Sequence, residues 1–173
     1  MLGLDFFVAI TLVVNQPAQP VKPTVWEVRI VVASVAALQE MCKTKKVNPI
    51  DILVDSVPTN NEPYHCVPGG VLQPHKQAHA NKETFVRPSY ASGDTVRWSS
   101  DVEFSIANIA VHDESEKQAA TAPKTPFVKF PFPTAATKSA TTSPITKESV
   151  GHRYKIDLRI GTRTIDPDVW CNP

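Results

Sequence analysis

Imidazole and thiol side chains gather in one short stretch of the sequence. Cys66, His75 and His79 lie within fourteen positions, and thiolate sulfur and imidazole nitrogen are ligands that zinc prefers. His75 and His79 are four residues apart and would share one face of a helix that Pro74 opens as its first residue. Because the spacing matches no closed zinc pattern, we favour polar loop histidines and expect no cofactor. A metal site at these three residues is the alternative.

The sequence lacks the common motifs of nucleophilic catalysis and phosphate binding. It contains no Gly-x-Ser-x-Gly elbow, and Gly69-Gly70 lacks the lysine and the glycine spacing of a phosphate-binding loop. Asp166 and Asp168 flank Pro167 and could offer oxygen ligands to calcium, although a turn explains them as well. We therefore predict that the protein is not an enzyme.

Three phenylalanines, Phe127, Phe130 and Phe132, stand close together between prolines. Each gains roughly 1.5–3 kcal/mol when it is buried rather than left in water. They form either an ordered flap over a sheet edge or a surface offered to a protein partner or to a second copy of the chain. The second interpretation makes them candidate partner-binding residues.

The charges of the chain nearly cancel, with 18 Lys and Arg against 17 Asp and Glu and a net charge of +1. Dedicated nucleic-acid binders carry a basic excess. Arg153, Lys155, Arg159 and Arg163 form a basic stripe that Asp157 interrupts, and a solvated strand face explains this stripe. We predict no nucleic-acid partner.

The cysteine count is odd, since the chain holds Cys42, Cys66 and Cys171. Sequence alone cannot give a disulfide pairing. We favour three reduced thiols in a cytoplasmic protein, and a bridge that ties down the C-terminus is the alternative.

The N-terminal stretch of residues 1–14 is apolar but too short to cross a bilayer as a helix. Asp5 interrupts it and no Lys or Arg precedes Lys22, which is atypical of a signal peptide. A buried strand over residues 6–14 is therefore expected. If residues 1–18 are instead a leader, the protein is secreted or periplasmic.

The elements that must position these residues are mostly strands. Apolar and polar residues alternate over 153–160, 26–32 and 50–55, which is typical of strands with one buried face. Gly93-Asp94 is turn chemistry, and the alternation over 95–98 and 102–106 predicts a hairpin with its turn at residues 99–101. The good helix formers of 34–46 predict one short helix that Ser34 could cap.

These elements predict an all-β fold, a single Greek-key β-sandwich domain of seven to nine strands with one short helix over residues 1–173. Two long segments, 58–82 and 112–150, are expected to be irregular. The predicted core consists of alternating apolar positions: Trp26, Val28, Ile30, Ile52, Val96, Trp98, Phe104, Ile106, Tyr154, Ile156 and Leu158.

Short motifs in the second half of the chain, over about residues 80–173, carry a resemblance to known domains. They are Gly93-Asp94-Thr95-Val96-Arg97-Trp98, Phe104-Ser105-Ile106, Thr125-Pro126-Phe127, His152-Arg153-Tyr154-Lys155-Ile156-Asp157 and Ile165-Asp166-Pro167-Asp168-Val169. In this order they resemble a copper-less cupredoxin-like or immunoglobulin-like bacterial β-sandwich domain, with the bacterial inclusion-body protein family as a competitor. The resemblance implies a fold and no catalytic residue.

The sequence therefore favours a non-enzymatic binding or self-assembly module. Its contacts would be made by the long segments 58–82 and 112–150, with protein or a second copy as partner and without a membrane span. The alternative function is a metal-binding protein that uses Cys66, His75 and His79.

Overall fold

The computed structural model describes residues 22–57, 61–80, 89–112, 123–127, 135–165 and 168–171. The strand or leader expected within residues 1–18 lies outside these ranges, as do Phe130, Phe132 and Asp166. No helix within the described ranges is long and apolar enough to cross a membrane.

Strands dominate the structure, and the predicted all-β class is confirmed. The strands are β1 (Val25–Ala33), β2 (Ile52–Asp55), β3 (Tyr64–Val67), β4 (Val71–Pro74), β5 (Ser89–Tyr90), β6 (Thr95–Val111), β7 (Thr137–Thr141), β8 (Arg153–Ile160), β9 (Arg163–Ile165) and β10 (Asp168–Cys171). The helices are α1 (Val35–Lys43) and α2 (His75–Ala80), with a single 3-10 turn, η1 (Lys147–Ser149).

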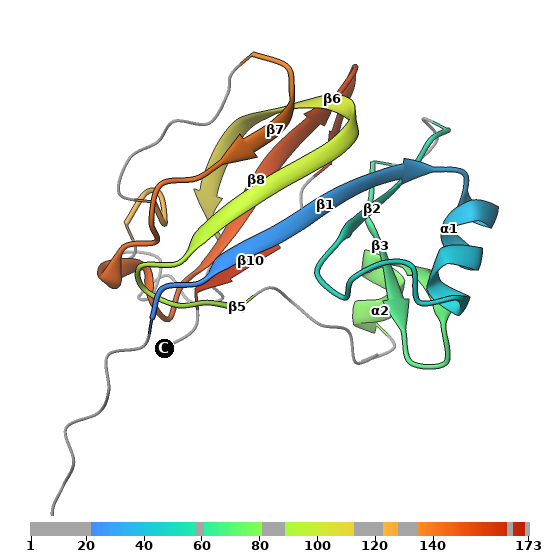
Figure 1. Cartoon of the computed structure of the whole chain (residues 1–173), viewed down its shortest axis with the longest axis horizontal. Helices are drawn as coiled ribbons and strands as arrows, with labels where there is room; N and C mark the ends of the chain where they lie inside the picture. The colour runs from blue at the N-terminus through green and yellow to red at the C-terminus, as the bar shows by residue number, and fades with distance from the viewer. Residues whose placement is uncertain are drawn as a thin grey trace, which may run out of the picture.

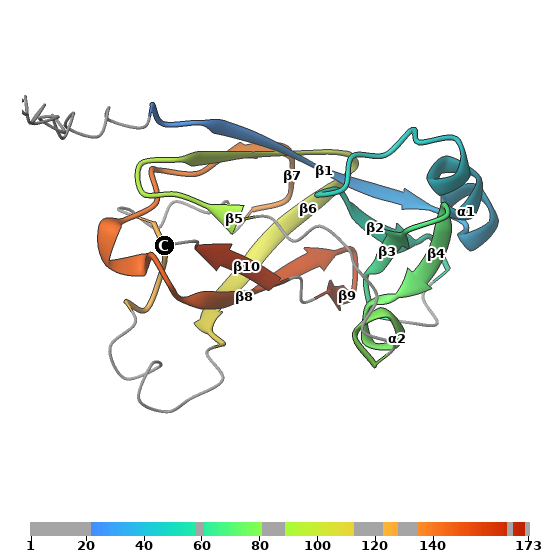
Figure 2. The same cartoon turned by 90° about the horizontal axis from the view of Figure 1, so that it is seen from below.

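The strands form one curled mixed sheet in the order β4-β3-β2-β1-β6-β8-β10-β5, with β7 beside β6 and β9 beside β8. β1 runs parallel to both β2 and β6, while β8 runs antiparallel to β6. Figures 1 and 2 show α1 and α2 at the same end of the molecule, beside β2, β3 and β4. The β1-α1-β2 connection is thus a parallel crossover unit.

The prediction of a hairpin with its turn at residues 99–101 is wrong, because β6 is one strand of 17 residues. Its first part pairs with β1 and its last part pairs with β8, so the strand passes from one half of the sheet to the other. The polar residues lie where the pairing with β7 shifts register between Ser99 and Phe104. A bulge of this kind bends a strand without ending it.

One large core lies between the two halves of the sheet. It contains ten of the eleven predicted core residues as buried side chains, and the remaining one, Trp26, packs against it partly buried. The period-two alternation of the strands accounts for this success, because successive side chains of a strand point to opposite faces.

The predicted helix is confirmed as α1, which begins after Ser34. The Ser34 hydroxyl accepts a hydrogen bond from the backbone N–H of Ala37 and so caps the helix. Leu38 and Cys42, four residues apart, are its buried side chains. They join Leu53 and other residues in a second, smaller core on the opposite face of β1 and β2.

The segment 58–82 is more regular than expected, since it holds the β3–β4 hairpin and α2. The backbone N–H of Gly70 donates to the Val67 carbonyl oxygen at 3.2 Å, and Gly69 and Gly70 have φ values of +87° and +72°. Pro68-Gly69-Gly70 is therefore a tight turn that suits glycine. Because the paired strands on either side are only four residues long, their alternation was too short to recognise.

Asp94 fastens the beginning of β1 to the turn before β6. Its buried carboxylate accepts hydrogen bonds from the Thr24 backbone N–H at 2.8 Å, the Trp26 indole N–H at 2.7 Å and the Ala91 backbone N–H at 2.9 Å. Three N–H donors offset the cost of burying this carboxylate. The Gly93-Asp94 turn thus sets the register of the parallel β1–β6 pair.

Tyr90 fills the core next to this turn and has a phenol without a hydrogen-bond partner among the described residues. Its ring meets Trp26 edge to face, with the ring centroids 5.5 Å apart. Burial raises the pKa of the Tyr90 phenol far above its usual range, and the nearby Cys171 and Asp94 raise it further.

Replacing this phenol by a phenyl ring, Tyr90→Phe, is expected to raise the free energy of unfolding by about 1 kcal/mol at pH 7, because an unsatisfied buried hydroxyl is removed. Above about pH 10 the unfolded tyrosine ionises while the buried one stays protonated, so the native protein loses stability as the pH rises. The advantage of the variant should therefore grow between pH 7 and pH 10.5 in urea unfolding curves. A variant less stable than the native protein would show that the hydroxyl has a partner.

Candidate functional site

The structure corrects the prediction of three reduced thiols, because Cys42 and Cys66 form a disulfide with their Cα atoms 5.4 Å apart. Cys171 stays a buried thiol outside this bond. A disulfide sulfur has no thiolate to offer, so Cys66 is also lost from the predicted metal trio. A pairing between Cys42 on a helix and Cys66 on a strand could not be read from spacing, since nothing in the sequence brings the two elements together.

Of the two histidines in the predicted trio, the structure describes the side chain of His75, which lies next to His65. His75 begins α2, and its Nδ1 lies 2.7 Å from Nε2 of His65 on β3. The His79 side chain lies outside the description. Within the described ranges, no three or more His, Cys, Asp or Glu side chains converge as a metal site would require.

The phenylalanine patch is described only at Phe127. Its side chain is 2% exposed, and its backbone bridges to Ile145. Phe127 therefore belongs to the core and is not available to a partner, which corrects its place among the partner-binding residues. Phe130 and Phe132 lie outside the described residues, and their role stays a prediction.

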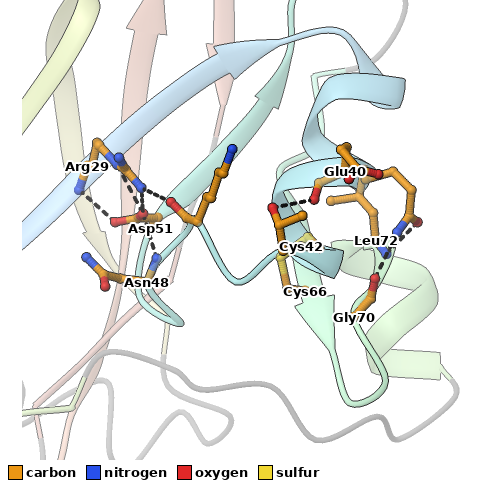
Figure 3. The surroundings of a disulfide bond; sticks show 11 residues. Arg29, Glu40, Cys42, Asn48, Asp51, Cys66, Gly70 and Leu72 are labelled. Carbon is orange, nitrogen blue, oxygen red and sulfur yellow. Dashed lines mark hydrogen bonds and ion pairs between the residues drawn. A yellow bond between two sulfur atoms is a disulfide. The ribbon is translucent and has the colours of Figure 1, made fainter.

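A pocket of about 900 Å³ opens beside the disulfide, between the end of α1, the 44–51 loop and the β3–β4 hairpin. Figure 3 shows the disulfide and the interactions around it. The pocket is lined by Cys42, Lys43, Lys45, Val47, Asn48, Pro49, Asp51, Leu53, His65, Cys66, Val67, Pro68, Gly69 and Gly70. It was not predicted from the sequence, although Pro68-Gly69-Gly70 contains the turn residues that build one wall.

The disulfide fixes the wall between α1 and β3. It joins residues that are 24 positions apart in sequence. For a loop of this length, the chain-entropy model gives about 3–4 kcal/mol of stabilisation through restriction of the unfolded chain. The relative position of the two elements is thus covalently fixed.

Gln39 on α1 holds the second strand of the hairpin. Its amide nitrogen donates to the Gly70 carbonyl oxygen at 2.8 Å, and its amide oxygen accepts from the Leu72 backbone N–H at 2.9 Å. These are the bonds that a neighbouring strand would make with the outer edge of β4. Gln39 therefore satisfies backbone groups that an edge strand would otherwise leave open.

The turn of the hairpin touches the helix backbone at Gly70. A Cβ at this position would lie 3.1 Å from the Lys43 Cα and 3.3 Å from the Cys42 carbonyl oxygen. Only a residue without a side chain allows this approach at a positive φ. The turn is therefore held against the last residues of α1.

The 44–51 loop forms the remaining wall, and Asp51 holds it in place. Its carboxylate, fully buried, accepts from the Arg29 guanidinium at 2.7 Å and from the Asn48 backbone N–H at 2.9 Å (Figure 3). Arg29 also donates to the Lys46 carbonyl oxygen at 2.9 Å. Lys45, two residues after the end of α1, has a φ of +52°, the left-handed conformation that commonly terminates a helix, and its backbone N–H donates to the Cys42 carbonyl oxygen at 3.2 Å.

The pocket combines positive charge with an apolar lining. Lys43 and Lys45 line it, and neither forms an ion pair with a described residue. The one carboxylate in the lining, that of Asp51, is already paired with Arg29. Apolar side chains such as Leu53 and Val67 make up much of the remainder. The arrangement suits an anionic group attached to an apolar body.

The close approach at Gly70 can be tested with its neighbour as the control. Gly69 also has a positive φ, but a Cβ there would meet nothing within 4 Å. Gly69→Ala should cost about 1–2 kcal/mol of unfolding free energy through backbone strain alone. Gly70→Ala should cost at least about 1 kcal/mol more, because the helix backbone must also move. Equal losses in urea unfolding would contradict the contact with α1.

Comparison with protein-family models, with curated proteins and with solved structures found no significant match to this chain. The resemblance to cupredoxin-like or immunoglobulin-like domains, and that to the inclusion-body protein family, therefore stay predictions.

Proposed function

We propose that the protein is a non-enzymatic binding module whose ligand site is the pocket beside the Cys42–Cys66 disulfide. Its ligand is a small anion, with a carboxylate, sulfonate or phosphate group on an apolar body. The observation that carries this proposal is that Lys43 and Lys45 line a largely apolar pocket without a partner carboxylate among the described residues.

The size and lining of the pocket support a small ligand. Pockets of roughly 300–1,000 Å³ with a few polar groups in an apolar lining are typical of small-molecule sites, and this one measures about 900 Å³. Ammonium groups next to apolar walls attract an anion more strongly than the same groups in open water, because the walls reduce screening.

The rigidity of the walls supports binding as well. The disulfide, the Gln39 amide and the Arg29–Asp51 pair fix three sides of the pocket before any ligand arrives. A preformed site loses little conformational entropy when it binds, and this leaves more of the contact energy as affinity.

The proposed pocket overlaps one of the two segments that the sequence predicts to make contacts. Residues 65–70 of the pocket lie in the 58–82 segment, which was expected to make contacts. Self-assembly through Phe130 and Phe132 is a separate prediction, since those residues lie outside the description.

The test uses 1-anilinonaphthalene-8-sulfonate, a fluorescent anion with an apolar body. We expect saturable binding, weakened at least tenfold, or about 1.4 kcal/mol, in the double variant Lys43→Ala, Lys45→Ala. The uncharged analogue N-phenyl-1-naphthylamine should lose little from the same change.

The matched control is Lys138→Ala, Lys147→Ala, which removes two exposed lysines on β7 and η1. It lowers the net charge equally and should leave affinity unchanged. Equal loss in both double variants would reduce the effect to overall charge, and absence of saturable binding would refute the pocket as a ligand site.

We also infer that the protein works in an oxidising compartment, outside the reducing cytosol, because the Cys42–Cys66 disulfide is part of the structure. This inference favours the secreted or periplasmic alternative over the cytoplasmic location expected from the sequence.

Thiol counting in protein taken from its native cells tests the compartment. After acid quenching and denaturation, a maleimide–polyethylene glycol reagent should label one thiol, Cys171, and all three cysteines after reduction. Three labels before reduction would place the protein in a reducing compartment.

A further inference from the structure

The disulfide between α1 and β3 forms part of the pocket wall, since both of its cysteines line that cavity (Figure 3). The two cysteines differ in exposure. Cys42 is 3% exposed and belongs to the second core, whereas Cys66 is only partly buried and packs against that core. A molecule that enters the pocket therefore reaches the Cys66 side of the bond more readily than the Cys42 side.

Contacts other than the disulfide also hold α1 against the β3–β4 hairpin. The Gln39 amide bonds to the backbone of Gly70 and Leu72, and Leu38 of α1 shares the second core with Tyr64 of β3. None of these contacts needs the sulfur–sulfur bond. The bond can therefore open while its two sulfur atoms stay close to each other, and it can close again.

Two ammonium groups belong to the same wall. Lys43 directly follows Cys42, Lys45 lies two positions further on, and both are exposed residues that line the pocket. Neither forms an ion pair with a described residue. The nucleophile of thiol–disulfide exchange is a thiolate. Positive charge near a disulfide therefore attracts an anionic attacking molecule and also stabilises the thiolate that leaves.

We propose that the Cys42–Cys66 bond is a site of thiol–disulfide exchange with a small anionic thiol, which carries a carboxylate, sulfonate or phosphate group besides its sulfur. The inference rests on the proposed function, because the same two lysines attract the anion. It adds that the ligand holds a thiol and is captured covalently. The pocket volume of about 900 Å³ suits a small molecule.

The exchange conserves electrons, since one disulfide replaces another. The thiolate sulfur of the ligand attacks Sγ of Cys66 and forms a new sulfur–sulfur bond. The bond to Cys42 breaks, and its electron pair stays on Sγ of Cys42, which then takes a proton from water. When Cys42 loses this proton again, its thiolate attacks Sγ of Cys66 and expels the ligand as a thiolate. Cys171 takes no part, because it is a buried thiol outside the bond.

The test compares how fast three thiols of similar size open the disulfide of the full, oxidised chain under native conditions. 2-Mercaptoethanesulfonate is anionic, 2-mercaptoethanol is neutral and cysteamine is cationic, and each is used at the same thiolate concentration. Newly formed protein thiols are counted with the maleimide–polyethylene glycol reagent after acid quenching and denaturation. We expect the anionic thiol to react at least about tenfold faster than the cationic one.

Lysine variants separate the effect of the pocket from the intrinsic chemistry of the thiols. In Lys43→Ala, Lys45→Ala the rate ratio of the anionic to the cationic thiol should fall at least about fivefold, whereas Lys138→Ala, Lys147→Ala should keep the ratio of the unmodified protein. Differences in nucleophilicity cancel in this comparison, because every variant meets the same thiols. An equal ratio in all three proteins would overturn the inference.

Mass spectrometry of the unmodified protein keeps the test independent of how well the variants fold. After exchange with 2-mercaptoethanesulfonate, acid quenching and digestion at acid pH, we expect the adduct on Cys66. No adduct, or an adduct on Cys42 or Cys171 alone, would overturn the inference. If the naphthalene sulfonate still binds saturably and through the two lysines, the proposed function stands without the exchange, so the two failures are distinguishable.

Discussion

The fold depends on β6, because this one strand of 17 residues belongs to both halves of the sheet. The side chains of Val96, Trp98, Phe104 and Ile106 are buried in a single core, first beside β1 and then beside β8, and Val102 packs against this core partly buried. The bulge at residues 99–104 bends the strand while this alternation continues. Two sheet halves can therefore close over one set of apolar side chains without a break in the strand.

The position of the candidate site follows from a second constraint, which is that β2 is buried on both faces. All four residues of β2 are buried, since Ile52 and Val54 face the main core while Leu53 faces α1. The helix that covers this second face has only nine residues. Beyond Lys43 the chain must return to β2 as a loop, and the space between this loop, the helix end and the β3–β4 hairpin is the pocket. The concave surface therefore arises because the short helix α1 covers β2, a strand that is buried on both faces.

The sequence patterns predicted the features that depend on neighbouring residues, whereas the contacts between distant segments were not predicted. The core positions and the Ser34 cap follow from alternation and capping chemistry, which act within a few residues. The continuity of β6 was missed because Ser99, Ser100 and Asp101 are turn formers, although the unbroken even-numbered alternation across them argued for one strand. The Cys42–Cys66 bond and the Gly70 contact with α1 join residues about 24–28 positions apart, and the spacing of residues in the sequence does not reveal such contacts.

The same alternation explains why Cys66, which the sequence analysis grouped with His75 and His79, does not lie with His75. Neighbouring residues of a strand point to opposite faces, so Cys66 on β3 turns toward α1, together with Tyr64, whereas His65 turns toward α2. Figure 2 shows the two helices on different sides of the β3–β4 hairpin. Because thiol and imidazole are close in sequence, a single site for both was suggested. The pleat of β3 instead places Cys66 on one face, where it forms the disulfide, and His65 on the other face, next to His75. Because the cross-link fixes β3 against α1, it also fixes the strand from which His65 reaches His75.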